Sequence, residues 1–242
     1  MTSRRRSTDD SKKLPSAGSK IFIISAAIVL VLVLGVTVYL NNNKGGPVQD
    51  PASVTAKEAA KAKKRGMDLY RQGKWDSAVE EFKKAVAGNP RDIYAQFQLA
   101  YAYEQKGQVD NAYKRYQEIL KIDKSSADAH NNIGRILMQK KELDKAITEF
   151  ETAVKLDTDF TSALANLADA YTQKKDYEKA LSTYDALAEI IKDNYFLSRI
   201  HAAKGNIYVQ MDMVRKASGE FTTALELNKN NEEAAAGLKN LK

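Results

Sequence analysis

Two patterns of hydrophobic and polar residues divide this chain. From residue 21 to residue 40 no residue is charged and most are aliphatic. Beyond residue 55, apolar and charged residues are mixed, and Ala, Lys, Glu, Leu and Tyr dominate, which is a helix-forming composition. Between these regions lies a segment of Asn, Gly and Pro, which interrupt helices. The pattern predicts a basic tail over 1–20, an apolar helix over 21–40, a flexible linker over 41–55 and a helical domain over 56–242.

The apolar segment is long enough to cross a bilayer, because a helix of this length spans about 30 Å. A cleaved signal peptide is the alternative, but its apolar core is normally shorter, about 7–15 residues. Basic residues cluster before the segment, and only Lys44 follows it closely. The positive-inside rule therefore predicts a single-pass protein of the cytoplasmic (inner) membrane, with a cytoplasmic N-terminus and a periplasmic or extracellular C-terminal domain. A eukaryotic organelle receptor whose domain faces the cytosol is a further alternative.

The helical region repeats with a period of 34 residues, apart from an insertion at 195–197. Three positions of the repeat keep their residue type in all five copies. The first is always tiny (Gly66, Ala100, Gly134, Ala168 and Gly205), the second is always Ala (Ala78, Ala112, Ala146, Ala180 and Ala217), and the third is always aromatic (Phe82, Tyr116, Phe150, Tyr184 and Phe221). Tiny residues let two antiparallel helices approach where they cross, and the aromatic ring fills the space one turn further along the second helix. Such units stack because none can bury its apolar face alone.

A helical hairpin of this length and residue order resembles the tetratricopeptide repeat (TPR) family. The resemblance implies an all-α fold: a right-handed superhelical solenoid of five helix-turn-helix repeats and a C-terminal capping helix, preceded here by one transmembrane helix. The repeats are expected at 59–92, 93–126, 127–160, 161–194 and 198–231, with the cap at 232–242. Repeats one and five depart from the family in one respect, because Arg65 and Lys204 replace a large apolar residue.

Composition and charge argue against several functions. The net charge is +7, but more than half of the excess lies in the first 20 residues, so the sequence does not predict a nucleic-acid-binding face. The absence of cysteine excludes thiolate metal sites and a cysteine nucleophile. His130 and His201 are the only histidines and are expected to be packing or surface residues. No set of residues meets the geometry of an active site, so we predict no enzyme activity, no cofactor, no metal and no small-molecule substrate.

The resemblance also implies a concave groove, lined by the first helix of each repeat. Tyr94, Phe97 and Tyr101 lie at helical spacing on one face and are candidate anchors for a peptide. They could instead pack against each other or against a neighbouring helix. The full set of predicted groove residues is Lys63, Met67, Tyr70, Arg71, Tyr94, Phe97, Tyr101, Asn131 and Arg135.

Together these observations predict a membrane-anchored scaffold, held to the lipid bilayer through residues 21–40. It would bind a peptide or helix of an envelope or secretion protein in its groove. The alternative is a structural subunit of a membrane assembly, such as secretion, pilus or polysaccharide machinery, in which the transmembrane helix contributes to contacts. Fold-level resemblance does not choose between partners.

Overall fold

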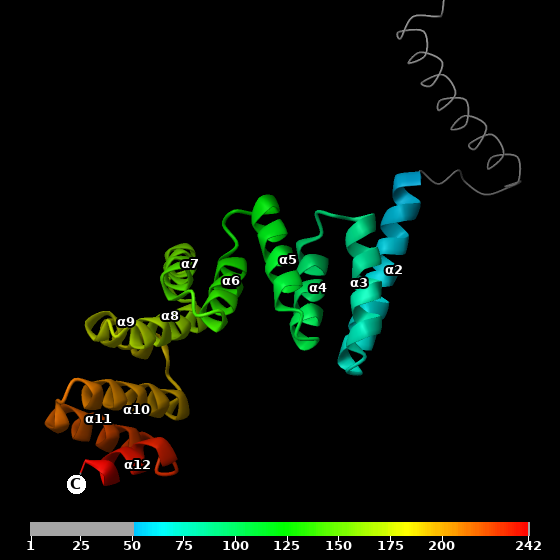
Figure 1. Cartoon of the computed structure of the whole chain (residues 1–242). Helices are drawn as coiled ribbons and strands as arrows, with labels where there is room; N and C mark the ends of the chain where they lie inside the picture. The colour runs from blue at the N-terminus through cyan, green and yellow to red at the C-terminus, as the bar shows by residue number, and fades with distance from the viewer. Residues whose placement is uncertain (1–50, 242) are drawn as a thin grey trace, which may run out of the picture. The chain divides into compact units, whose positions relative to one another are not determined.

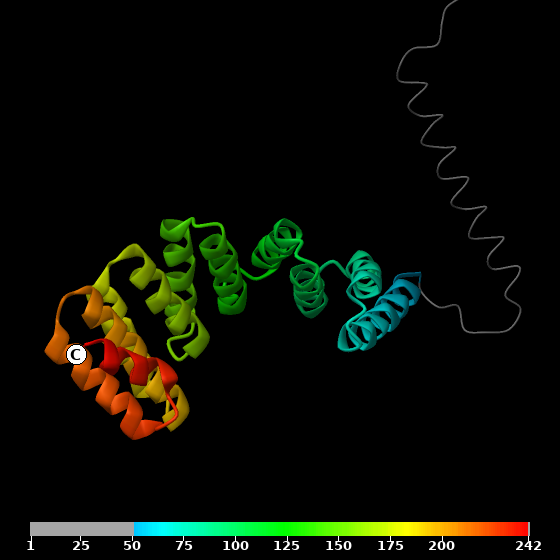
Figure 2. The same cartoon turned by 60° about the horizontal axis from the view of Figure 1, so that its bottom comes forward.

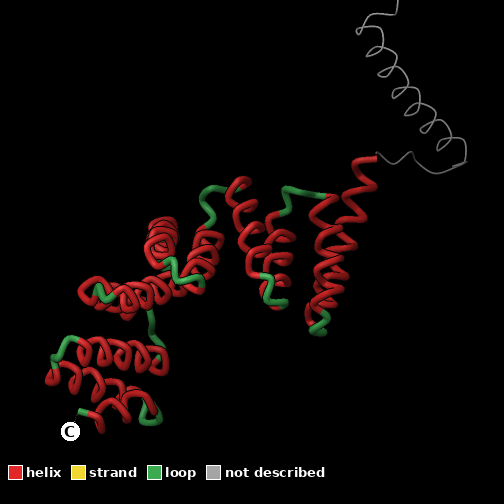
Figure 3. Tube along the Cα trace, in the orientation of Figure 1, coloured by secondary structure: helices red, strands yellow, loops and turns green. Residues whose placement is uncertain are grey.

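The computed structural model describes residues 51–241, which contain eleven helices and no strand (Figure 1). The helices are α2 (Pro51–Arg71), α3 (Trp75–Gly88), α4 (Ile93–Gln105), α5 (Val109–Ile122), α6 (Ala127–Gln139), α7 (Leu143–Leu156), α8 (Thr161–Lys174), α9 (Tyr177–Ile190), α10 (Asn194–Gln210), α11 (Val214–Leu227) and α12 (Glu232–Asn240). The residues from Thr55 onward form one compact unit. Its helices form successive antiparallel hairpins joined by short loops (Figures 2 and 3).

Each hairpin turns at the same repeat position. The residue there has a left-handed backbone conformation, with φ between 57° and 71°, in all five hairpins: Gly73, Gly107, Lys141, Lys175 and Asp212. A left-handed residue ends a helix because its N–H can bond back to a carbonyl of the last turn. Glycine adopts this conformation without a steric cost, which explains its use in the first two hairpins.

The following hairpin begins in most cases with a polar side chain that caps the first helix. Asp92, Ser126, Asp193 and Asn231 accept hydrogen bonds from backbone N–H groups at the starts of α4, α6, α10 and α12. Such caps satisfy donors that the helix itself leaves unpaired. The short polar loops therefore fix both ends of the helices and set the register of the array.

The repeated tiny and aromatic residues meet inside each hairpin, as the sequence predicts. In the first, third and fifth hairpins a glycine of the first helix faces Phe82, Phe150 or Phe221, and all three rings are fully buried. A methyl group on Gly134 would lie 2.6 Å from the ring of Phe150, so only glycine allows this approach. In the second and fourth hairpins Ala100 and Ala168 take the glycine's place, and the aromatic residue is tyrosine.

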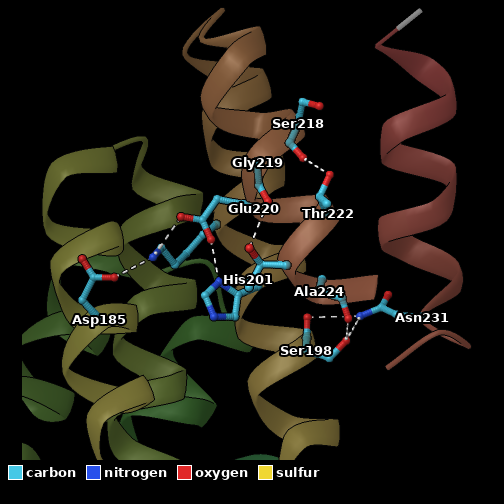
Figure 4. Close-up of polar contacts among 11 residues, drawn as sticks. Asp185, Ser198, His201, Ser218, Gly219, Glu220, Thr222, Ala224 and Asn231 are labelled. Atoms are coloured by element: carbon cyan, nitrogen blue, oxygen red, sulfur yellow. Dashed lines mark hydrogen bonds and ion pairs between the residues drawn. The ribbon is translucent and has the colours of Figure 1, made fainter. Parts of the chain in front are cut away.

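The fifth hairpin differs from the others in two respects. Residues 195–197 lengthen α10 to 17 residues, and Tyr195 and Phe196 in this added turn are exposed. Lys204 occupies the position of an apolar residue, and its ammonium group lies 2.7 Å from a carboxylate oxygen of Asp185 and 3.1 Å from one of Glu220. Figure 4 shows Asp185, His201 and Glu220 converging between neighbouring helices. Ionic contacts thus replace apolar packing at this junction.

The last helix, α12, packs against α10 and α11 and covers the end of the array. Asn231 caps it and also donates to the backbone carbonyl of Ser198, at 3.1 Å, and to its hydroxyl, at 2.8 Å (Figure 4). The Ser198 hydroxyl donates in turn to the carbonyl of Ala224. These buried hydrogen bonds join α10, α11 and the start of α12.

The predicted location in the cytoplasmic membrane is wrong, as the helices of residues 51–241 show. None of them is both long and apolar enough to cross a membrane. The longest, α2, carries charged residues such as Lys57, Lys61 and Lys64 along its length. The segment 21–40, on which the prediction of a transmembrane helix rests, lies outside the described residues.

The first helix begins earlier than the composition of the linker indicates. α2 starts at Pro51, within the segment 41–55 that is expected to be a linker. Proline is favoured at the first position of a helix, where its missing N–H costs nothing. The extension also packs on α3, because Gly88 approaches Ala59 and the carbonyl of Thr55 closely.

Candidate functional site

Residues of three successive first helices, α4, α6 and α8, form the surface that we call the first-helix face: Tyr94, Phe97, Tyr101, Glu104, Arg135 and Asn166. On this face α4 presents Tyr94, Phe97, Tyr101 and Glu104, one turn apart. Tyr94 is the most exposed of the three aromatic residues, at 47%, while Phe97 and Tyr101 are half-buried. The face therefore offers one exposed aromatic ring beside two that are partly covered.

Phe97 and Tyr101 stack on each other, with their ring centroids 6.0 Å apart and an interplanar angle of 25°. Both rings also contact the buried ring of Tyr116, at 5.9 and 6.2 Å. The two alternatives that the sequence left open are combined in the structure, because each ring packs on its neighbours and remains partly exposed.

Tyr94 contacts side chains of the first hairpin. Its hydroxyl donates to the sulfur of Met67 at 3.7 Å, and the ammonium group of Lys63 lies 5.6 Å from its ring centroid. Lys63 also pairs with Asp92, at 2.6 Å. Burial would raise the pKa of Asp92, but this ion pair and the backbone N–H of Ala95 lower it instead.

The other two predicted residues of the first hairpin lie near its turn. The ring of Tyr70 meets that of Trp75 edge to face, at 4.8 Å. Arg71 is exposed and lies 3.4 Å from Asp68. Tyr70 is thus held by a local contact, whereas the guanidinium group of Arg71 is largely solvated.

Polar side chains continue the face on α6 and α8. Asn131 is buried, and its side-chain oxygen accepts a hydrogen bond of 2.9 Å from Asn166. Arg135 is exposed; it donates to Asn132 at 2.8 Å and lies 3.4 Å from Glu104. This network connects three successive first helices.

An open depression of about 490 Å³ lies beside this network, at the hairpin-turn end of the first helices. Glu104, Arg135 and Asn166 supply its polar groups, and Val109, Ile136 and Met138 supply apolar surface. A depression with a few convergent polar groups on an apolar lining is typical of sites that orient a ligand. Of the predicted groove residues, only Arg135 lines it.

Tyrosine hydroxyls hold two carboxylates on this face. Tyr116 donates to Glu104 at 2.6 Å, and Tyr184 donates to Asp169. Burial is the main cause that raises the pKa of both tyrosines, and the adjacent carboxylates add to it. Both phenols therefore stay protonated and can donate at neutral pH.

Sequence reasoning missed the role of these tyrosines and of Asn166. The signal was present in the repeat itself, because Tyr116 and Tyr184 occur only in the two hairpins that have Ala in place of Gly. Asn166 belongs to the fourth repeat, from which the predicted groove set takes no residue.

The histidines make structural contacts between the two helices of a hairpin. His130 lies 2.6 Å from Glu149, and His201 lies 2.6 Å from Glu220. Within residues 51–241, no group of three or more His, Asp or Glu side chains is placed to hold a metal ion.

Family models described as tetratricopeptide repeat match residues 63–127, 105–159 and 137–207, which together span more than half of the chain. An uncharacterized protein of Haemophilus influenzae is 28% identical over 90 residues, 37% of this chain and 50% of that protein. TPR repeat-containing protein MJ1428 of Methanocaldococcus jannaschii is 38% identical over 61 residues, 25% of this chain and 11% of that protein. The chain thus spans half or less of the length of these curated relatives.

Solved structures agree on the fold. A crystal structure of MamA superposes with a TM-score of 0.66 at 22% identity, covering 72% of this chain and 93% of MamA. YrrB, described as a TPR protein with an unusual peptide-binding site, superposes with a TM-score of 0.64 at 16% identity, covering 78% and 98%. At these identities the likeness shows the fold alone. With the matches to the family models, it establishes that this chain belongs to the tetratricopeptide repeat family.

Proposed function

We propose that this protein is a protein-interaction scaffold whose first-helix face binds an extended or helical segment of a partner protein. The observation that carries the proposal is the exposed Tyr94, one turn before the partly covered and stacked rings of Phe97 and Tyr101 on the same helix. Aromatic side chains at the centre of an interface contribute a large share of the binding energy. Rings already held by Tyr116 lose little conformational freedom on binding, which favours affinity.

The depression at the hairpin-turn end of the first helices supplies the polar part of the proposed site. Arg135 is exposed and can bond a carboxylate or carbonyl of the partner. Asn166 and Gln173 lie in the same depression and can bond a peptide backbone. YrrB, which shares the fold, is described as having a peptide-binding site, which is consistent with this use of the fold.

The test is affinity capture from the native host, with wild type compared with a Tyr94→Ala/Arg135→Ala double variant. Both side chains are exposed, so their removal leaves the hairpins intact, whereas truncation of Phe97 or Tyr101 would also remove packing on Tyr116. A Thr152→Ala/Glu226→Ala variant of the second helices serves as the matched control.

We expect the double variant to lose the captured partner. Removal of two interface anchors should lower the affinity for the partner by about tenfold or more. The control should retain the partner. Equal capture by wild type and the double variant would refute the proposed site.

A further inference from the structure

A second depression, of about 280 Å³, lies on the opposite side of α4, between the second helices α3 and α5. Its apolar surface comes from Val86, Ala87, Leu99 and Tyr103, and its polar surface comes from Lys83, Asn111, Lys114 and Arg115. Its lining contains three cationic side chains and no carboxylate. We call it the outer pocket, and no part of it belongs to the first-helix face.

The repeat provides an internal comparison for this pocket, because the same positions recur at the later junctions between hairpins. The residues equivalent to Lys83, Lys114 and Arg115 are Gln117, Thr148 and Glu149 at the second junction, Glu151, Ser182 and Thr183 at the third, and Asp185, Gly219 and Glu220 at the fourth. Each later junction carries at least one carboxylate at these positions and no cation. The first junction alone has three cations there.

At the later junctions these carboxylates bond to donors of the same chain. Glu149 pairs with His130 at 2.6 Å, and Tyr171 donates to Glu151. Asp185 and Glu220 share Lys204 between them, as Figure 4 shows for the two acidic residues. Each later junction therefore has, among these three positions, a carboxylate that is paired with a donor of a neighbouring helix.

The first junction keeps donors but lacks the carboxylate. Tyr103 is the equivalent of Tyr171, yet Lys83 stands where Glu151 would receive its hydroxyl. Lys83 pairs with the exposed Glu80, at 2.8 Å. Arg115 lies 3.5 Å from the amide oxygen of Gln96. Within the described part of the chain neither Lys114 nor Arg115 forms an ion pair, although the charge of Lys114 lowers the pKa of Asp110, one turn away on α5. The acidic residues of α5 that flank them in sequence, Asp110 and Glu118, form their ion pairs with Lys140 and Lys121.

We propose that the outer pocket binds an acidic segment of a partner protein, with a Glu or Asp side chain between Lys83, Lys114 and Arg115 and an adjacent apolar side chain on Val86 and Tyr103. The charge of the lining selects the occupant. A carboxylate from a partner would supply the group that the other junctions take from their own chain. Arginine and lysine bind carboxylates through charge-assisted hydrogen bonds, which are stronger than neutral ones.

The test is selection of peptides from a displayed library of random dodecapeptides on the full chain. Selected peptides are then titrated against a Lys83→Gln/Lys114→Thr/Arg115→Glu variant by fluorescence anisotropy. Its three new residues are those of the second junction, so the fold already accepts them at these positions. A Lys124→Gln/Lys155→Thr/Lys229→Glu variant changes the net charge equally at exposed sites elsewhere.

We expect a class of peptides with Asp or Glu beside an apolar residue, whose affinity falls about tenfold or more in the outer-pocket variant. Their affinity should be unchanged in the charge-matched control and in Tyr94→Ala/Arg135→Ala, and should weaken as salt increases. The last variant separates this proposal from the proposed function. If no acidic class is enriched, or if the outer-pocket variant binds that class as tightly as wild type, the proposal is wrong.

Discussion

At the scale of the residue, one choice between Gly and Ala governs what the paired aromatic side chain does. Where the first helix has Gly134, the ring of Phe150 lies against the backbone and is fully buried. Where it has Ala100, the partner is Tyr116, whose hydroxyl reaches Glu104 on the first-helix face. The same fold position thus serves packing alone in three hairpins and also orients a carboxylate in two.

Gly134→Ala should destabilise the protein by about 1–3 kcal/mol, because the new methyl group would overlap the ring of Phe150 and force it to move. Gly219→Ala is the matched control, since a methyl group on this glycine of α11 meets nothing within 4 Å. That change should stabilise the helix by about 0.5–1 kcal/mol. Urea unfolding of both variants measures the contrast, and equal effects would contradict the proposed close packing.

Tyr116→Phe should cost about 1.5–3 kcal/mol, the usual net value of a hydrogen bond to a charged group. The phenylalanine ring fits, because Phe82, Phe150 and Phe221 occupy the equivalent position. Thermal unfolding measures the loss. A larger cost would mean that the ring itself is displaced, and no cost would mean that the bond to Glu104 contributes nothing.

At the scale of the element, specific polar side chains fix the last helices of the array to one another. Asn231 caps α12 and bonds to Ser198, so one side chain both starts the helix and fixes it to α10. Lys204 connects Asp185 of α9 to Glu220 of α11. The side chain of Asn231 is buried and those of Lys204 and Glu220 are largely buried, whereas Asp185 is exposed.

Asn231→Ala should destabilise the C-terminal hairpin by about 1–3 kcal/mol, since it removes a helix cap and leaves the buried hydroxyl and carbonyl of Ser198 without this donor. Asn230→Ala, at an exposed neighbouring position, should change stability by less than about 0.5 kcal/mol. Hydrogen exchange of α12 distinguishes local from global loss. Equal protection in both variants would contradict the role of Asn231.

The lowered pKa of Glu220 leads us to expect that the free energy of unfolding decreases in acid. Burial raises its pKa, but hydrogen bonds from His201 and Lys204 outweigh this effect and lower the pKa below its ordinary value. Because the folded pKa is below the unfolded one, the stability from Glu220 is present above the unfolded pKa of about 4.3 and is lost as pH falls through the folded pKa.

Glu220→Gln should therefore cost about 1–2 kcal/mol near neutral pH, where a charge-assisted bond is replaced by a neutral one. The difference between wild type and the variant should shrink as pH falls below about 5. Urea unfolding at several pH values checks this expectation. A difference that stays constant across that range would show that the ionised carboxylate of Glu220 is not the stabilising group.

At the scale of the whole molecule, the sequence predicted the repeated fold well, because the same positions pack against each other in each of the five hairpins. All five repeats have a tiny residue and an aromatic residue at the same two positions, which makes the period unambiguous. The structure confirms the all-α solenoid and has a final helix, α12, at its C-terminal end. The location in the membrane was wrong, since the helices of the described residues all carry charged residues and none can cross a bilayer.

The candidate site was harder to predict, because function uses the positions where the repeats differ. Whether Phe97 and Tyr101 are covered depends on the ring of Tyr116 from another helix, which periodicity alone does not reveal. The outer pocket likewise follows from a comparison between junctions, where Lys114 and Arg115 break the pattern set by the later ones.

The most direct test of the central proposal, that the first-helix face binds a partner protein, is site-specific photo-crosslinking in the native host. A photoreactive phenylalanine analogue replaces Tyr94 or Arg135 on that face, and Thr152 or Glu226 on the second helices serves as the control position. We predict that the two first-helix positions crosslink to one common protein and that the control positions do not. Crosslinks to a common partner from the control positions, with none from Tyr94 or Arg135, would contradict the account.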